Sequence, residues 1–365
     1  MQSDPLESLS IAEAKTLQFR LIDCITREFS GEEILSAGDY GVRQPLNQPN
    51  RTRRLERVLA DFFGVEDAVF VMGSGTGALR EAFSAVFAKS TSRRVLVHDA
   101  PVYSTTATTF AQLGVRTIAA DFHDPIAVRR ALDAGVDVVL VQHARQTLRD
   151  RYDLSTVIHG IKRESDVPII TDENYAVMKT KEIGAQVGAD LSGFSLFKLR
   201  GPEGVGLVAG QKKWIDVIRA FHYSGGSQIQ GPIAMEALRG MIDAPVALAI
   251  QAEETEAMAE RLCRGEVSGV QEALVANAQS KVVLVHLEEP IAEEVIQRAN
   301  RLGAATWPVG SESRYEVVPM FYRVSGTMRA EDPDAERYWI RINLMRAGHE
   351  TALRILRGAL GEEQD

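Results

Sequence analysis

One segment of the chain combines an apolar run, a lysine and a glycine-rich turn: Phe194-Ser195-Leu196-Phe197-Lys198-Leu199-Arg200-Gly201-Pro202-Glu203-Gly204-Val205-Gly206. Lys198 stands at the end of an apolar run, three residues after Ser195 and just before a glycine-rich turn. Lysines are only nine of the 41 basic residues of the chain. Because an amine can lose its proton and attack a carbonyl, whereas a guanidinium cannot, this placement favours a reactive lysine. The alternative is a lysine whose stem covers apolar surface.

The sequence on either side of residues 194–206 alternates short apolar runs with segments of helix length. This pattern is typical of a mostly parallel sheet with helices on both faces, in which ligands bind at the carboxyl ends of the strands. We therefore predict an α/β fold with a seven-stranded sheet. The expected strands are residues 68–72, 95–97, 116–119, 136–141, 167–171, 193–197 and 205–209.

A different order of elements begins near residue 245. The sequence predicts three parts: a helix and arm over residues 1–50, a large domain over 51–245 and a smaller α+β domain over 246–365, which the amino-terminal segment completes. In the first part we expect a helix at 11–29 and an irregular stretch at 38–50. In the last part the expected helices are 246–263, 291–302 and 350–360, and the expected strands are 281–287, 315–324 and 338–344.

The composition excludes several classes of protein. With 365 residues, 45% apolar content and a net charge of −9, the chain has a large core and no basic footprint for nucleic acid. It shows no signal-peptide pattern and no membrane-length apolar run, so we expect a cytoplasmic protein. Cys24 and Cys263 are far apart and lack the spacing of a metal site or disulfide framework.

A glycine-rich segment, Gly73-Ser74-Gly75-Thr76-Gly77-Ala78, follows the first expected strand and opens a helix. Backbone N–H groups at such a helix start form an anion site that suits a phosphate. The segment lacks the Lys-Ser/Thr ending of a P-loop and the last glycine of the GxGxxG pattern. A tight structural turn is the alternative.

Two further residues follow expected strands. Asp172 ends the run 167–171, where a buried carboxylate is costly without a partner such as a protonated pyridine nitrogen. A helix cap is the other use of Asp at such a junction. Tyr103 follows the strand 95–97 and could lay its ring on a planar cofactor, or pack in the core.

The order of glycine turn, aromatic residue, Asp and Ser-x-x-Lys resembles the fold type I enzymes dependent on pyridoxal 5′-phosphate (PLP), the aspartate aminotransferase superfamily. Residues 39–43 resemble the Tyr-x-Arg element of the cysteine/methionine-metabolism lyases, with a spacing one residue longer. Residues 194–210 look like the lysine segment of selenocysteine-synthase-type proteins. As a whole the sequence looks closest to uncharacterised bacterial aminotransferase-like proteins of the YhfS type.

The resemblance implies a role for each matching residue. Lys198 forms the internal aldimine and shuttles the Cα proton, Asp172 holds the pyridine nitrogen and Tyr103 stacks on the ring. The implied phosphate ligands are Gly75, Thr76, Gly77 and Ser195, joined by Tyr40 and Arg43 from the neighbouring subunit of a homodimer. The residue that contacts the ring hydroxyl of PLP is either His143 or Gln146. His143 is equally compatible with a histidine buried in the core.

Arg341 lies inside an expected strand with apolar neighbours, where a buried guanidinium needs an anion. The matching strand of the resembled family carries the arginine that binds the substrate carboxylate. An internal salt bridge is the alternative, and Arg323 is a competing candidate. Residues 224–228 resemble a dimer-interface segment near the neighbour's phosphate, although a plain loop fits equally well.

We therefore predict an aminotransferase-like PLP enzyme of amino-acid metabolism that acts on a small-molecule amino acid. A β/γ-eliminating lyase is the alternative, or a racemase, because one cofactor and one lysine serve all three reactions. Two alternatives are not PLP enzymes: the protein could be a non-catalytic PLP-binding regulator, or it could bind a nucleotide. We expect a homodimer with shared active sites and no nucleic-acid or membrane partner.

Overall fold

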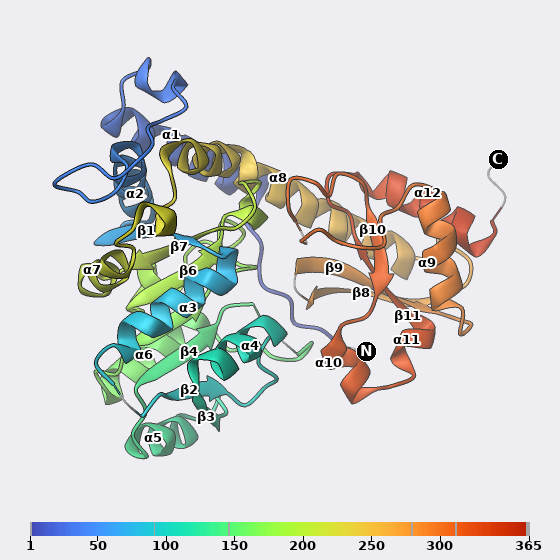
Figure 1. Cartoon of the computed structure of the whole chain (residues 1–365). Coiled ribbons are helices and arrows are strands. Elements are labelled where there is room, and N and C mark those ends of the chain that lie inside the picture. The colour runs from blue at the N-terminus through green and yellow to red at the C-terminus, as the bar shows by residue number, and fades with distance from the viewer. Residues whose placement is uncertain (1, 91, 145–146, 279, 311, 363–365) are drawn as a thin grey trace. The chain divides into compact units, whose positions relative to one another are not determined.

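The computed structural model describes residues 2–362 except 91, 145–146, 279 and 311. The chain divides into two compact units (Figure 1). The large unit comprises Ala12–Ala144 and Tyr152–Pro245, and the small unit comprises Met1–Ile11, Arg145–Arg151 and Val246–Asp365.

The large unit is built on the predicted seven-stranded sheet, with the strand order β1-β7-β6-β5-β4-β2-β3. Strand β7 runs antiparallel to both of its neighbours, and the other pairs are parallel. The expectation of a mostly parallel sheet is thus confirmed. The strands are β1 Asp67–Met72, β2 Arg94–His98, β3 Arg116–Ala120, β4 Val138–Gln142, β5 Ile169–Asp172, β6 Leu191–Ser195 and β7 Val205–Gly210.

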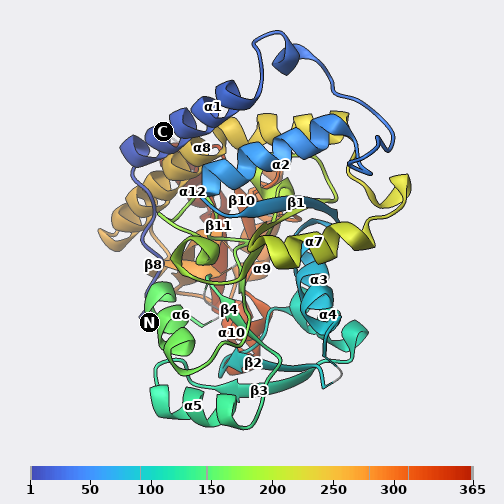
Figure 2. The same ribbon diagram turned by 90° about the vertical axis from the view of Figure 1, so that its left-hand side faces the viewer.

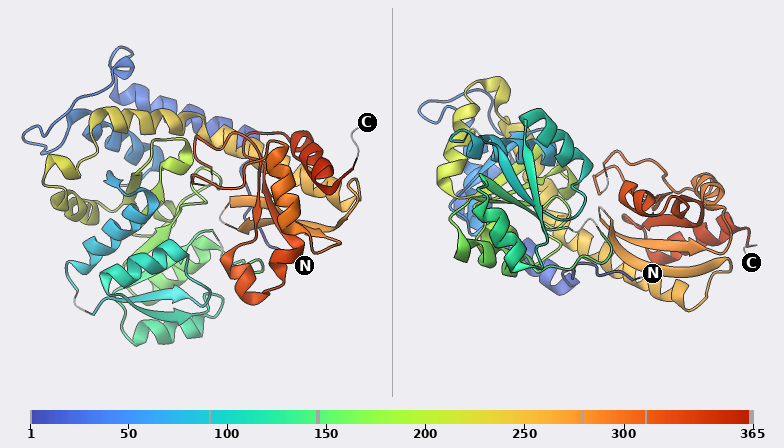
Figure 3. Two further views of the ribbon diagram at one scale, coloured as in Figure 1. Left: turned by 45° about the vertical axis from the view of Figure 1, so that its right-hand side comes forward. Right: turned by 90° about the horizontal axis from the view of Figure 1, so that it is seen from below.

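Helices cover both faces of this sheet (Figures 2 and 3). One core layer joins the sheet to helices α3, α4 and α7, and a second joins the opposite face to α5 and α6. Alternate residues of β4 supply the two layers, because side chains along a strand point to opposite faces. The helices of this unit are α1 Ile11–Glu28, α2 Asn50–Phe63, α3 Ser74–Phe87, α4 Ser104–Leu113, α5 Pro125–Asp133, α6 Leu154–Glu164 and α7 Lys212–Phe221, and the short 3-10 turns are η1 Glu33–Leu35, η2 Gly184–Val187, η3 Phe197–Leu199 and η4 Gly225–Ser227.

Local sequence explains where several of these helices begin and end. Asp124 accepts a hydrogen bond from the Ile126 N–H at the start of α5, and Asp153 caps α6 in the same way. Gly64 and Gly114 adopt the left-handed conformation that ends α2 and α4, with φ of 64° and 65°.

Helix α8, Gly231–Cys263, begins in the large unit and ends in the small one. The sequence predicted that a helix begins at residue 246, directly after Pro245. That prediction was wrong: α8 continues through Pro245, the last residue of the large unit.

The small unit contains a four-stranded antiparallel sheet in the order β10-β11-β9-β8. Helices α9 and α12 pack on one face, and α10 and α11 supply buried residues to the other. Strand β8 was not predicted, and most of the strand expected at 315–324 is loop. The elements are β8 Val270–Ala278, β9 Ser280–Leu287, α9 Ala292–Arg301, β10 Met320–Arg323, α10 Gly326–Glu331, α11 Ala335–Tyr338, β11 Trp339–Asn343 and α12 His349–Leu360.

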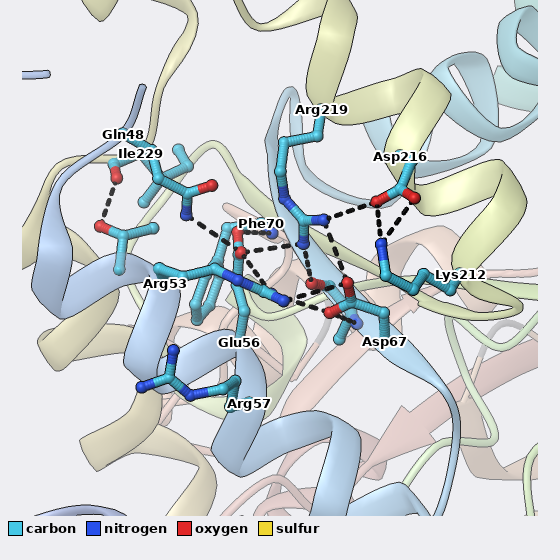
Figure 4. Close-up of polar contacts among 12 residues, drawn as sticks. Gln48, Arg53, Glu56, Arg57, Asp67, Phe70, Lys212, Asp216, Arg219 and Ile229 are labelled. Atoms are coloured by element: carbon cyan, nitrogen blue, oxygen red, sulfur yellow. Dashed lines mark hydrogen bonds and ion pairs between the residues drawn. The ribbon is translucent and has the colours of Figure 1, made fainter. Parts of the chain in front are cut away.

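A buried cluster of charges joins α2 to β1 and α7 in the large unit (Figure 4). Arg53 donates to both carboxylate oxygens of Asp67, at 2.8 and 3.1 Å. Arg219 reaches Asp67 at 3.0 Å and Glu56 at 3.2 Å, and Glu56 also accepts from Gln48. Each buried charge of this cluster is therefore paired.

Among the described helices, none is long and apolar enough to cross a bilayer.

Candidate active site

Lys198 lies in η3, directly after strand β6. The sequence predicted that the strand extends to residue 197, but β6 ends at Ser195 and the chain turns. The N–H groups of Leu199 and Gly201 both donate to the Leu196 carbonyl, at 2.9 Å each, and this closes the turn. Lys198 Nζ lies 4.6 Å from the centre of the Tyr175 ring. The lysine is therefore held at the carboxyl end of a sheet strand, where α/β folds bind ligands.

The glycine loop, residues 73–77, leads from β1 into α3. The N–H groups of Gly73 and Ser74 donate to the Gly204 carbonyl, at 2.7 and 3.1 Å. A Cβ atom on Gly77 would overlap the Met72 carbonyl oxygen, so only glycine fits there. Because the leading N–H groups of a helix have no partner within it, Gly75 and Thr76 retain donors for an anion.

Strand β7 brings Ser195 next to the glycine loop. Gly206 pairs with Ser195 across the sheet, and a Cβ atom on Gly206 would overlap the Ser74 carbonyl oxygen. The Ser195 hydroxyl is fully buried and has no hydrogen-bond partner among the described residues. A buried hydroxyl without a partner is costly, and a bound phosphate at the loop would satisfy it.

Asp172 ends β5 and is buried, as the sequence predicted. Its Oδ1 accepts hydrogen bonds from the backbone N–H and the side-chain amide of Asn174, at 3.0 and 2.7 Å. Within the described part of the chain, no cation lies at ion-pair distance. The pKa of the Asp172 carboxyl is raised, mainly by burial and also by the charge of Glu173. The hydrogen bonds from Asn174 and the charge of Lys198 act in the opposite direction.

Asn174 connects three of the predicted cofactor ligands, and the sequence analysis gave it no role. Besides its bonds to Asp172, its Oδ1 accepts the Ser195 N–H at 3.0 Å. A Cβ atom on Gly75 would overlap that same oxygen. One amide side chain therefore fixes Asp172, the end of β6 and the glycine loop relative to each other.

Tyr103 lies at the amino-terminal end of α4 and is half-buried. Its ring meets the Tyr175 ring edge to face, with centroids 6.2 Å apart. Tyr175 thus lies next to both Tyr103 and Lys198, a position that sequence reasoning missed. The signal was present, because Tyr175 follows Asp172 within the same loop.

His143 follows β4 and is buried at the carboxyl edge of the sheet. Its backbone N–H donates to the Asp172 carbonyl at 3.1 Å. Its Nδ1 lies 2.6 Å from Oε2 of Glu173, which is fully buried. The alternative candidate, Gln146, lies outside the described residues.

Tyr40 and Arg43 belong to the arm, residues 38–48. In Figure 2 the arm, in blue, meets the segment after α7, in yellow, and the Asn47 amide donates to the Tyr223 carbonyl at 3.1 Å. Arg43 pairs with Asp39 at 2.8 Å, and Tyr40 is 71% exposed. Among the described residues, no contact joins Tyr40 or Arg43 to Lys198, Asp172 or the glycine loop.

Arg341 is buried in β11 of the small unit. Its Nε–H donates to the Arg323 carbonyl at 2.8 Å, and its guanidinium lies 4.2 Å from the centre of the Tyr322 ring. It also lines a cavity of about 350 Å³ within the same unit. The Arg323 side chain is exposed, whereas Arg341 lines this cavity together with Arg149.

Comparisons with known proteins show the family to which the chain belongs. The class-V aminotransferase model matches residues 51–239, and the C-terminal domain model of YhfS-like proteins matches residues 256–356. The uncharacterized protein YhfS of Escherichia coli (strain K12) is 49% identical over 361 residues, which is 99% of each chain.

Solved structures are similar along the whole chain. The crystal structure of the pyridoxal-5′-phosphate dependent protein YhfS from Escherichia coli has a TM-score of 0.97 at 48% identity and covers 100% of both chains. A cystathionine gamma-lyase from Micromonospora echinospora has a TM-score of 0.72 at 18% identity, covering 94% of this chain and 98% of its own, and shows the shared fold alone. The chain therefore belongs to the class-V aminotransferases, a family of PLP-dependent enzymes, and within them to the YhfS-like proteins.

Proposed function

We propose that the large unit binds PLP at Lys198 and that the chain is an aminotransferase-like enzyme of amino-acid metabolism. The observation that carries the proposal is the buried Ser195 hydroxyl beside the donors of the glycine loop, which has no hydrogen-bond partner among the described residues. A phosphate bound there would take hydrogen bonds from Ser195 and from the N–H groups of Gly75 and Thr76, while Gly77 lets the backbone turn.

The other groups fit the rest of the cofactor. Asp172 is a buried carboxylate with no cation at ion-pair distance among the described residues, which suits a protonated pyridine nitrogen, and Tyr103 offers an aromatic face. When bound, PLP supplies an electron-withdrawing ring that stabilises negative charge at the Cα atom of an amino acid. Lys198 Nζ would hold the cofactor covalently and, once released, hold the proton taken from Cα.

Arg341 is proposed to bind the substrate carboxylate, since a planar guanidinium donates two parallel hydrogen bonds to it. Its burial and the cavity before it support this role. In R341K we expect KM for the amino acid to rise by about ten- to a hundredfold, because a lysine cannot make the paired contact. R323K is the matched control and should change KM by less than about twofold. If R341K and R323K change KM equally, Arg341 does not bind the substrate carboxylate.

We also propose a cytoplasmic homodimer with shared active sites, and the exposed side chains of the arm support the dimer. Tyr40 and Tyr223 are 71% and 79% exposed, and Leu46 and Phe221 add apolar surface to the same contact region. Large exposed apolar groups mark interaction surfaces. Tyr40 and Arg43 would then reach the cofactor phosphate of the neighbouring subunit.

An eliminating lyase is the second candidate, favoured by the Tyr40 and Arg43 element in the arm. Incubation of the PLP-loaded protein with amino acids separates the two reactions. Ammonia and a 2-oxo acid formed without an acceptor indicate elimination. Dependence on a second 2-oxo acid indicates transamination.

The cofactor proposal is tested by the absorption spectrum after PLP is added. We expect a visible absorption band in the wild-type protein and its loss in K198A. K212A is the control, because Lys212 is exposed and pairs with Asp216 at 2.6 Å. A wild-type protein that PLP leaves colourless would contradict the proposal.

A further inference from the structure

An arginine of helix α3 lies beside the glycine loop and has no role in the function proposed so far. Arg80 is half-buried. Its Nη2 atom lies 3.2 Å from where a Cβ atom on Gly73 would stand, and 3.7 Å from where a Cβ atom on Gly77 would stand. The guanidinium is therefore next to the backbone of the loop at both of these glycines.

The geometry of α3 explains this placement. Arg80 follows Gly77 by three residues and Thr76 by four, so the three residues share one face of the helix. Side chains on a helix lean toward its amino terminus, and the long stem of an arginine extends back over the preceding turn. The sequence therefore brings the charge of Arg80 toward the helix start, where the leading N–H groups have no partner within the helix.

The charge of Arg80 has no hydrogen-bond or ion-pair partner among the described residues. The acid next to it in sequence, Glu81, lies with its Oε2 atom 3.9 Å from His222 Nε2. Arg53 and Arg219 in the same unit are paired with carboxylates. Arg80 thus keeps a positive charge available at the loop.

We propose that Arg80 is the cation that this chain supplies to the phosphate site, and that its guanidinium binds the phosphate group of PLP. This role rests on the proposed function for the identity of the ligand. Arg43 would add a second positive charge to the same phosphate, from the neighbouring subunit.

The charge of the ligand is the reason that a cation is needed. A phosphate monoester carries about 1.5 to 2 negative charges at neutral pH. The other donors proposed for it within the chain, the Ser195 hydroxyl and the N–H groups of Gly75 and Thr76, are neutral. A negative charge that leaves water needs a partner of opposite charge, and a guanidinium offers paired N–H groups that match phosphate oxygens.

The test compares the binding of PLP and of pyridoxal, which has the same ring and aldehyde but no phosphate, to the cofactor-free protein. In R80Q we expect Kd for PLP to rise by about ten- to a hundredfold, because hydrogen bonds to a charged group are lost. Kd for pyridoxal should change by less than about twofold. R80K keeps the charge without the planar fork, so its Kd for PLP should lie between those of the wild type and R80Q.

The matched control is R116Q. Arg116 is exposed at the first residue of β3, whereas the glycine loop lies at the carboxyl end of β1. R116Q removes the same charge as R80Q and should leave both Kd values unchanged. An unchanged Kd for PLP in R80Q overturns the inference. An equal rise of Kd for PLP and pyridoxal also overturns it, because such a rise means that Arg80 only maintains the shape of the loop.

If R80Q does not fold, the wild-type protein provides the measurement. The nitrogen-15 NMR signals of the Arg80 side chain, identified by their absence in R80K, should shift when inorganic phosphate is added to the cofactor-free protein. No shift overturns the inference. Failure of the wild-type protein to bind PLP contradicts the proposed function instead, and the response of Arg80 to inorganic phosphate still decides whether it binds an anion.

Discussion

Asp67 and Asp172 are both buried carboxylates of the large unit, and they have opposite surroundings. Asp67 lies between Arg53 and Arg219 (Figure 4), which donate to both of its oxygens. Asp172 receives hydrogen bonds from Asn174 and has no cation at ion-pair distance among the described residues. Desolvation acts to raise the pKa of both carboxyls. The two arginines outweigh it at Asp67, where the pKa is lowered, whereas the pKa of Asp172 is raised.

Ser192 and Ser195 differ in the same way along strand β6. Both are fully buried. The Ser192 hydroxyl contacts Thr171 Oγ1 at 2.7 Å and accepts the Ala185 N–H at 2.8 Å, whereas the Ser195 hydroxyl has no partner within the described residues. Paired polar groups satisfy their hydrogen bonds within the folded chain, and unpaired ones at the carboxyl edge of the sheet support the proposed ligand site.

The largest expected effect is that of D67N. It leaves two partly buried guanidinium groups, each 18% exposed, short of a charge partner, so we expect the free energy of unfolding to fall by about 3 kcal/mol. Urea unfolding of the cofactor-free protein measures this loss. D216N is the control, because Asp216 pairs with Arg219 at the surface and should change stability by less than about 0.5 kcal/mol. A small effect of D67N would mean that the cluster is not what stabilises this region.

The two serines give a paired prediction of intermediate size. S192A should destabilise the cofactor-free protein by about 1–3 kcal/mol, since it leaves a buried N–H unsatisfied. S195A should not destabilise that protein and should weaken PLP binding by about tenfold. Unfolding curves and PLP titrations of both variants test the contrast. A stability loss in S195A equal to that in S192A would show that the Ser195 hydroxyl has a structural partner.

The smallest effect is a gain of stability in D172N without cofactor. The raised pKa means that the Asp172 carboxyl holds its proton more tightly in the folded chain than in the unfolded chain. The stability that this proton contributes is therefore complete below about pH 4 and is lost as the pH rises through the folded pKa. D172N cannot ionise, and at neutral pH we expect it to exceed the wild type by on the order of 1 kcal/mol. Unfolding at acidic and neutral pH measures the difference. A variant less stable than the wild type at neutral pH contradicts the assignment.

Much of the large unit was predictable from sequence because its buried strands are short apolar runs between helices. Strand β8 was not predicted because Val270–Ala278 is an edge strand of mixed polarity, with an irregular register at Val270 and Glu272. The predicted helix start at residue 246 was wrong because α8 begins at Gly231 and continues through Pro245, although a proline inside a helix removes a hydrogen bond.

The positions of the candidate site residues were predictable where each follows the end of its own strand, as for Lys198, Asp172 and the glycine loop. A role was not predictable where it depends on partners distant in sequence. Asn174 acquires its role from Ser195 and Gly75. Spacing along the chain does not reveal such contacts, because the sheet order creates them.

The most direct test of the account is to identify the lysine that holds PLP. Borohydride reduction of the PLP-loaded protein followed by peptide mass mapping should find the cofactor on Lys198 alone. Lys179 is the internal comparison, because its Nζ also faces the Tyr175 ring, at 5.7 Å against 4.6 Å for Lys198. Modification of Lys198 and not Lys179 is the predicted result; PLP fixed to Lys179, or to no lysine, would contradict the account.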